Sequence, residues 1–223
     1  MRIALISANL GGYDESSAWP SLEAPAGVSL HVLRLTDSDV PPRPLAMTSR
    51  LQCGIPKWFG HDFAPDADVL IWIDASCATT PMTVAWFLER LAGAEIAVFK
   101  HPERATIRDE YAFMVERMAR PGETYLNSRY RGEDVRGQFE YIERRGLAGL
   151  PLYASTAFAY QPTKRVVAAL AECFALKCRF LLHDQLAFPY VLHQHACRVN
   201  VIPDNYLKCP ALTFTRIGRR RVA

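Results

Sequence analysis

The sequence lacks an apolar run long enough to cross a membrane and lacks a cysteine pattern typical of a zinc site. A membrane-spanning helix needs about 20 consecutive apolar residues, and no stretch of the 223 residues approaches that length. The opening segment, MRIALISANLGG, has no small-residue cleavage site after a longer apolar run, so it predicts a first strand and not a signal peptide. The six cysteines form no C-x-x-C pair, which favours free thiols and a cytoplasmic location.

Two further classes of function find little support in the composition. The formal net charge is only +3, and part of the excess lies in the C-terminal RIGRRRVA, so charge does not indicate a nucleic-acid partner. The first glycine turn does not read G-x-G-x-x-G, so the dinucleotide-binding fingerprint is missing. Half of the residues are hydrophobic and 22% are charged, which is typical of a soluble globular protein.

Apolar runs that end at turn residues alternate with amphipathic stretches, and this order predicts an α/β protein. We expect a mixed, largely parallel central sheet flanked by helices. The predicted strands are 2–9, 28–37, 68–76, 95–103, 152–162 and 198–207. A helical segment is predicted near 48–59, broken by Gly54 and Pro56. A second helix begins at Thr80-Pro81 and ends at Gly93. Further helices are predicted over 106–120, 133–146, 163–177 and 183–195, and the last is bent near Pro189. The spacing of Ile107, Tyr111, Met114, Val115 and Met118 predicts a core stripe.

The sequence shows no repeat and no clear linker, so one domain over residues 1–223 is expected. We expect a nucleotide-binding half at about 1–100, an acceptor half at about 101–210 and a basic tail over 211–223.

Polar residues follow the first three predicted strands: Asn9 before Gly11-Gly12-Tyr13, Thr36-Asp37, and Asp74-Ala75-Ser76. In a parallel sheet these ends lie at one edge, where open α/β sheets bind ligands. The glycines would let backbone N–H groups approach a ligand closely, and Tyr13 could stack on a base. Asp37 could accept hydrogen bonds from a base or ribose, and Asp74 could hold a ribose or a divalent cation beside a diphosphate.

Several motifs occur along the chain in a fixed order. They are Gly11-Gly12-Tyr13-Asp14, Arg50, DVLIWIDAS at 68–76, His101-Pro102-Glu103-Arg104 and Asp184-Gln185. In this order they resemble a glycosyltransferase-like family, formerly of unknown function, that includes plant proteins of pectin and mucilage synthesis. The resemblance spans roughly residues 5 to 190. It implies a single GT-A fold with a Rossmann-like sheet, and transfer of a sugar from a nucleoside-diphosphate donor to a hydroxyl acceptor.

The resemblance also implies roles at the end of the third strand. GT-A enzymes commonly use Asp-x-Asp there to hold Mn²⁺ or Mg²⁺ on the donor diphosphate. In this chain Asp74 and Ser76 stand at the two positions, and a hydroxyl is a poorer cation ligand than a carboxylate. Without a metal, Arg50, Lys57 or Lys100 would have to carry the diphosphate charge.

The later motifs supply the remaining candidates. His101 and Arg104 could contact donor phosphate, donor sugar or acceptor; alternatively His101 caps its loop and Arg104 pairs with Glu103. Asp184, followed by Gln185, is the predicted catalytic residue, which would bind the acceptor hydroxyl or act as its base; alternatively it is only a helix N-cap. His183, His193 and His195 are further candidate metal ligands, or structural histidines.

Two other functions stay open at this point. An aspartate-nucleophile phosphatase or phosphotransferase would use Asp74, but Thr79 stands one residue too far along and the motif follows the third strand instead of the first. A catalytically silent nucleotide-binding protein would explain Ser76 in place of an aspartate. The sequence indicates neither the donor sugar and base, nor the acceptor, nor the oligomeric state.

Overall fold

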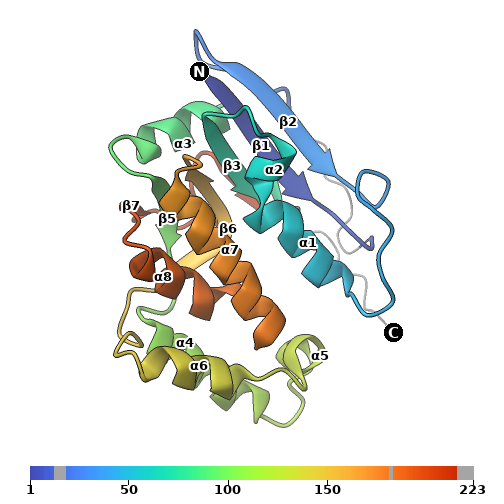
Figure 1. Cartoon of the computed structure of the whole chain (residues 1–223), viewed down its shortest axis with the longest axis vertical. Helices are drawn as coiled ribbons and strands as arrows, with labels where there is room; N and C mark the ends of the chain where they lie inside the picture. Colours follow the sequence, from blue (N-terminus) through green and yellow to red (C-terminus); the bar gives the residue numbers. More distant parts are fainter. Residues whose placement is uncertain (13–18, 181–182, 215–223) are drawn as a thin grey trace.

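The computed structural model describes residues 1–12, 19–180 and 183–214, and its centre is a six-stranded sheet (Figure 1). Tyr13, Asp14 and the basic tail from residue 215 onward lie outside the described residues. The strands follow the order β2-β1-β3-β6-β5-β7 across the sheet. They are β1 (Arg2–Ala8), β2 (Ser29–Leu35), β3 (Val69–Ile73), β5 (Ile96–Lys100), β6 (Tyr153–Tyr160) and β7 (Val199–Ile202).

The strand directions confirm the predicted mixed, largely parallel sheet. The pairs β1–β2, β1–β3 and β5–β7 are parallel, whereas β6 is antiparallel to both β3 and β5. In the register, Ala8 lies opposite Leu35 and Ile6 lies opposite Trp72. The carboxyl ends of β1, β2 and β3 therefore lie at one edge, and the amino end of β6 reaches the same edge beside β3.

Successive side chains of each strand point to opposite faces of the sheet, and helices cover the apolar side chains on both faces. Ala4 and Ile6 of β1 face the core under α1 (Ser49–Trp58), α7 (Lys164–Arg179) and α8 (Asp184–Gln194). Ile3 and Leu5 face the opposite core, which α3 (Thr83–Leu91) covers. A small second sheet pairs β4 (Cys77–Thr79) with β8 (Leu212–Phe214). Figure 1 shows α1 and α7 in front of the sheet.

Three helices form a separate layer at the lower end of Figure 1: α4 (Ile107–Met118), α5 (Tyr125–Tyr130) and α6 (Val135–Glu143). In α4, Ile107 and Met114 are buried, but Val115 is 46% exposed. The predicted core stripe is therefore wrong at Val115. No helix in the described part of the chain is long and apolar enough to span a membrane.

Two helix predictions are corrected by the structure. α1 is continuous through Gly54 and Pro56; it is anchored by buried residues at its C-terminal end, and this packing outweighs the helix-breaking tendency of proline. A Cβ on Gly54 would lie 3.2 Å from the Phe174 ring, so the glycine allows α1 to approach α7 closely. α3 begins at Thr83, and not at Thr80-Pro81, which precede it in a turn where the Thr83 hydroxyl accepts a hydrogen bond from the Thr80 N–H.

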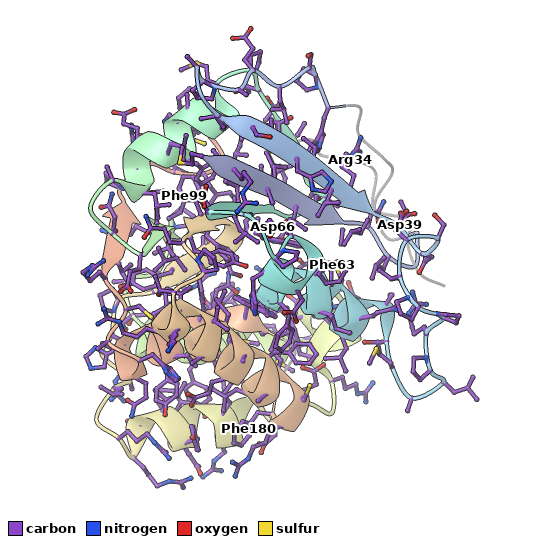
Figure 2. All side chains as sticks on the ribbon, turned by 45° about the horizontal axis from the view of Figure 1, so that its top comes forward. Arg34, Asp39, Phe63, Asp66, Phe99 and Phe180 are labelled. Atoms are coloured by element: carbon purple, nitrogen blue, oxygen red, sulfur yellow. The ribbon has the colours of Figure 1, made fainter. Side chains whose placement is uncertain are left out.

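The remaining differences are small. α8 continues through Pro189 to Gln194. The short helices α2 (Gly60–Phe63) and α5, and the β4–β8 sheet, have no counterpart among the predicted elements. β2 forms an edge of the main sheet, and Figure 2 shows Arg34 on its outer side, while Phe99 of β5 is buried.

Candidate functional site

Asp74 and Asp184, which belong to different motifs, meet at the buried amine of Lys57. Lys57 Nζ lies 3.3 Å from Asp74 Oδ1, 2.8 Å from Asp184 Oδ2 and 3.3 Å from Ser155 Oγ. The Lys57 side chain is only 8% exposed. Lys177 Nζ pairs with the other oxygen of Asp184. We call these five residues, Lys57, Asp74, Ser155, Lys177 and Asp184, the Lys57 cluster.

Each member of the Lys57 cluster comes from a different part of the fold. Lys57 lies near the end of α1 and Lys177 near the end of α7. Asp74 directly follows β3, and its backbone N–H donates to Thr156 in β6. Ser155 belongs to β6, and Asp184 is the first residue of α8. The cluster therefore lies at the carboxyl edge of β3, where the sequence predicts the site.

Asp74 is the carboxylate of the cluster with more access to solvent. Its side chain is 35% exposed, compared with 13% for Asp184. Trp72, two residues earlier on β3, donates its indole N–H to Asp74 Oδ1 over 2.7 Å. The tryptophan and Lys57 thus bind the same oxygen and orient the carboxylate.

The two carboxylates of the cluster have pKa values shifted in opposite directions. Burial raises the pKa of Asp74, and the Lys57 ammonium and the Trp72 N–H offset this only in part. Burial acts in the same direction on Asp184, but Lys177 and Lys57 outweigh it and hold the pKa of Asp184 well below its usual range. For Lys57, burial is outweighed by Asp184 and Asp74, which raise its pKa. Asp184 is therefore ionised at neutral pH, and Asp74 accepts a proton more readily.

The loops after β1 and β2 meet at this same edge. Gly11 donates its N–H to Asp37 Oδ2 over 2.7 Å, and Arg43 donates to Asp37 Oδ1 over 2.5 Å. Asn9 donates its backbone N–H to Leu35. Gly11 and Gly12 have φ values of +74° and +60°, which favour glycine. Asp37 thus holds the glycine turn; contact of Asn9, Gly11, Gly12, Tyr13 or Asp37 with a nucleotide stays a prediction.

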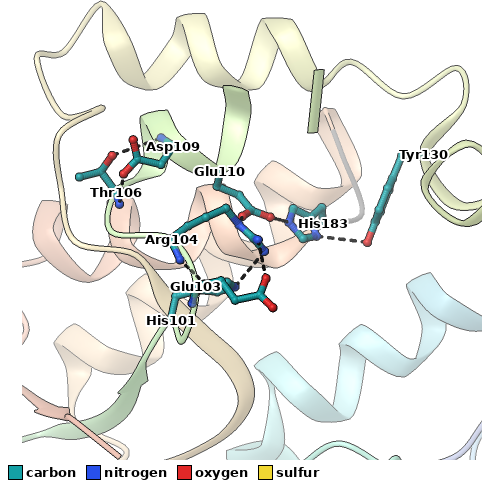
Figure 3. Close-up of polar contacts among 8 residues, drawn as sticks. All are labelled: His101, Glu103, Arg104, Thr106, Asp109, Glu110, Tyr130 and His183. Carbon is teal, nitrogen blue, oxygen red and sulfur yellow. Dashed lines mark hydrogen bonds and ion pairs between the residues drawn. The ribbon is translucent and has the colours of Figure 1, made fainter. Parts of the chain in front are cut away.

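The residues of the HPER motif make local contacts (Figure 3). The His101 Nδ1 atom accepts hydrogen bonds from the N–H groups of Glu103 and Arg104, at 3.3 and 3.1 Å. Arg104 pairs with Glu103 at 2.8 Å. The local alternative for this motif is therefore present in the structure. Burial and the neighbouring Arg104 lower the pKa of His101, so its ring is neutral at neutral pH.

A second buried acid connects the HPER motif to α8. Glu110 of α4 is 2% exposed, pairs with Arg104 Nε and lies 2.7 Å from His183 Nε2. The other ring nitrogen of His183 lies 3.1 Å from the hydroxyl of Tyr130 (Figure 3). Arg50, which the sequence links to diphosphate binding, lies over the Tyr130 ring, with 4.9 Å between its Cζ and the ring centroid. His183 immediately precedes Asp184, so this network adjoins the Lys57 cluster.

Glu110, Tyr130, Ser155 and Lys177 are not among the predicted site residues. One signal was present for Glu110, because it stands three residues after Ile107 and four before Met114, on the apolar face of α4. Lys177 likewise follows the buried Cys173 by one helical turn. A charged residue in phase with an apolar stripe indicates a buried partner of opposite charge.

The donor groups near Asp74 and Ser76 do not fit a divalent cation in this arrangement. Such ions prefer several oxygen ligands, mostly carboxylates, and the described residues contain no group of three His, Cys, Asp or Glu side chains placed to hold one. The Lys57 ammonium also lies 3.3 Å from Asp74 Oδ1, where it would repel a cation. His183 contacts Glu110 and Tyr130, and His195 contacts Glu172.

Two surface hollows lie away from the Lys57 cluster. One is lined by Trp19, Leu30, Val32 and Arg34 at the outer side of β2. The other lies at the amino ends of the strands, beside Phe63 and Asp66, which Figure 2 labels. Neither is lined by a member of the cluster, and within the cluster the half-buried Asp74 carboxylate has more solvent access than Asp184 or Lys57.

The fold defines an α/β protein with a polar cluster at the carboxyl edge of its sheet. No protein-family model matches the chain, and no curated protein matches it. A solved structure with a similar chain path is a glycosyltransferase involved in the glycosylation of the major capsid of PBCV-1. The two chains share 9% identity, the match covers 90% of this chain and 81% of that one, and the TM-score is 0.45. We therefore take the argument for function from the site itself.

Proposed function

We propose that the chain is a glycosyltransferase that moves a sugar from a nucleoside-diphosphate donor to a hydroxyl acceptor at the Lys57 cluster. The observation that carries this proposal is the meeting of Asp74 and Asp184 at one buried lysine. These aspartates belong to the WIDAS and DQ motifs, which are distant in sequence. Their meeting point lies at the sheet edge where open α/β proteins bind ligands.

Sugar transfer asks two things of such a site. The bond between the anomeric carbon and the diphosphate oxygen breaks, so negative charge grows on the departing diphosphate. A bond from the acceptor oxygen forms, and the acceptor proton must leave. Fixed cations and dipoles that face the growing charge lower the barrier. The candidate cations for the diphosphate are Lys57, Arg50 and Lys100. Contact of the donor with His101 and Arg104 stays a prediction.

The opposite pKa shifts divide the roles of the two aspartates. A general base works best when its pKa is near the working pH, and the two lysines lower the pKa of Asp184. We therefore assign the proton-accepting role to Asp74, whose pKa is raised and whose side chain is partly exposed. Asp184 would hold the two ammonium groups in place, with Gln185 beside it. Paired carboxyl groups with separated pKa values are typical of acid–base sites.

A Mn²⁺ or Mg²⁺ ion is implied by the resemblance to GT-A enzymes, with Asp74 and Ser76 as its ligands. Because the Lys57 ammonium occupies the vicinity of Asp74, the proposed steps use the residues of the chain alone. Binding of a nucleoside diphosphate should be measured by the rise in melting temperature, once with Mn²⁺ and once with a chelator. The comparison decides the metal requirement, because a ligand that binds the native state raises its stability.

The test of the function is a screen of nucleotide-sugars that detects released nucleoside diphosphate. We expect release from at least one donor, and a loss of about 100-fold in Asp74→Asn, in the range for removal of a general base. Glu116→Gln is the control, because Glu116 pairs with Arg120 at the exposed surface of α4.

Two outcomes would overturn the proposal. One is neither release nor a shift in melting temperature with any nucleoside diphosphate. The other is phosphate release from a generic phosphoester that Asp74→Asn abolishes, which would indicate the phosphatase instead.

A further inference from the structure

We infer that Glu110 is a positioning residue: it fixes the first turn of α8 so that Asp184 stays between Lys57 and Lys177. The effect of this residue on catalysis rests on the proposed function, whereas its effect on the geometry of the Lys57 cluster can be measured independently. Glu110 itself belongs to α4, which lies in the lower layer of the molecule (Figure 1).

The position of Glu110 is tightly fixed. α4 begins with a capping box, in which Thr106 and Asp109 bind each other's backbone N–H groups at 3.0 and 3.2 Å. Glu110 follows directly, and each of its carboxylate oxygens has a partner, Arg104 on one side and His183 on the other (Figure 3). Burial would raise the pKa of Glu110, but His183 and Arg104 outweigh it and lower that pKa, so the carboxylate is ionised.

His183 connects Glu110 to the start of α8. It is the N-cap residue of α8, and its ring lies between Glu110 and Tyr130, 2.7 and 3.1 Å from their oxygens. Asp184 is the next residue, so a rotation or shift of the His183 backbone moves the Asp184 carboxylate directly. A ring held from both sides restricts that movement.

The same network also reaches the helix that carries Lys57. Tyr130 lies under Arg50, and Arg50 donates to the backbone carbonyl of Arg129 over 2.9 Å. Arg50 and Lys57 both belong to α1, seven residues and about two turns apart. The first turn of α8 is therefore joined to α1 twice, once by Asp184–Lys57 and once by His183–Tyr130–Arg50.

The placement of Glu110 is hard to explain by stability alone. It occupies a core position of α4 between Ile107 and Met114, where an apolar side chain would avoid the cost of burying a charge. Buried ion pairs that are replaced as a whole by well-packed apolar residues often lose no stability, so stability does not require Glu110 together with its partners Arg104 and His183. A positioning role accounts for an acid at this place, because only an acceptor can bind both Arg104 and His183.

The test is chemical labelling of lysine amines, read residue by residue by mass spectrometry at short reaction times. In the native protein Lys57 and Lys177 should react slowly, because both are buried and paired with Asp184. In Glu110→Gln we expect their labelling to rise by about tenfold, the scale set by losing a hydrogen bond between charged groups. The exposed Lys100 and Lys208 should label as before.

Glu95→Gln is the matched control. Glu95 is also 2% exposed and binds Arg165 and the backbone of Arg198, at 3.4 and 3.0 Å, outside the network of Glu110. It should lower the melting temperature without changing the labelling of Lys57. Glu110→Asp keeps the charge on a shorter side chain and should give an intermediate rise; it also serves if Glu110→Gln does not fold.

Unchanged labelling of Lys57 in both Glu110 variants, or an equal rise in Glu95→Gln, would overturn the inference. In the transfer assay, Glu110→Gln should lower kcat and leave KM for the donor nearly unchanged, with partial recovery in Glu110→Asp. If the native protein transfers no sugar, the proposed function fails, and the labelling still decides the role of Glu110.

Discussion

At the scale of single residues, Lys57 is a buried charge that depends on its partners. Moving an ammonium group out of water costs several kcal/mol, and here Asp74, Asp184 and Ser155 replace that water. The two carboxylates depend on the Lys57 ammonium in the same way, because they also lose contact with water. Removing one partner therefore leaves buried charge without compensation.

Replacement of Lys57 by methionine should lower the free energy of unfolding by about 3 kcal/mol, the usual cost of breaking a buried ion pair. Lys57→Met keeps most of the apolar volume but leaves Asp74 and Asp184 without the shared ammonium group. Urea unfolding followed by circular dichroism measures the change. Arg120→Gln should change the same quantity by less than about 0.5 kcal/mol, because its pair with Glu116 is exposed. Equal effects of the two substitutions would show that the cluster is not stabilising.

The low pKa of Asp184 predicts the pH dependence of stability. A carboxylate with a depressed pKa stabilises the fold fully above the unfolded value, about 3.9 for aspartate, and this contribution is lost as the pH falls through the folded value. The difference in unfolding free energy between the native protein and Asp184→Asn should therefore shrink from about pH 5 to about pH 2. Urea titrations at a series of pH values measure it. A difference that grows on acidification would contradict the ionised state of Asp184.

The sequence allowed Asp74, Asp184 and Lys57 to be predicted as site residues, but not Ser155, Lys177 or Glu110. Asp74 and Asp184 stand at the end of an apolar strand and the start of a helix, and these positions can be recognised locally. Glu110 and Lys177 stand inside amphipathic helices, where charged residues usually face solvent. Their phase with an apolar stripe indicates burial, but a single sequence does not show which element covers them or which charged group they meet.

At the scale of elements, α1 shows how packing outweighs local propensity. The sequence predicts a break at Gly54 and Pro56, yet the helix continues and places Lys57 and Trp58 in the interior. Trp58 lies 5.7 Å from Phe158 and 5.2 Å from Phe188 between ring centroids. Gly54 lets this helix approach α7, which carries Lys177.

Gly54→Val should lower the free energy of unfolding by about 2 kcal/mol, in the range for overpacking a core. The added side chain would press on the Phe174 ring, 3.2 Å from the position of a Cβ. The resulting separation of α1 and α7 should also raise the labelling of Lys57 and Lys177. Gly149→Val is the control, because a Cβ there would meet nothing within 4 Å. Thermal and urea unfolding measure the stability of both variants. An unchanged free energy of unfolding in Gly54→Val would show that the Phe174 side chain can move away at no cost.

At the scale of the whole molecule, the class of fold could be predicted but the order of the strands could not. All six strands of the main sheet match predicted segments, because each is a short apolar run between turn residues. The insertion of β6 between β3 and β5, opposite in direction to both, is a non-local pairing. It joins a strand from the predicted acceptor half to strands from the predicted nucleotide-binding half.

The antiparallel direction of β6 has a consequence for how the Lys57 cluster forms during folding. Ser155 lies near the amino end of β6, and Asp74 follows the carboxyl end of its neighbour β3. Because the two strands are antiparallel, both residues lie at the same edge of the sheet. The pairs Lys57–Asp74 and Lys177–Asp184 are each close in sequence, but the two pairs are joined only by the contact between Lys57 and Asp184, which are 127 residues apart. Before α8 has docked, Asp74 and Lys57 would lack their partner Asp184, so the complete Lys57 cluster forms only with the finished tertiary structure.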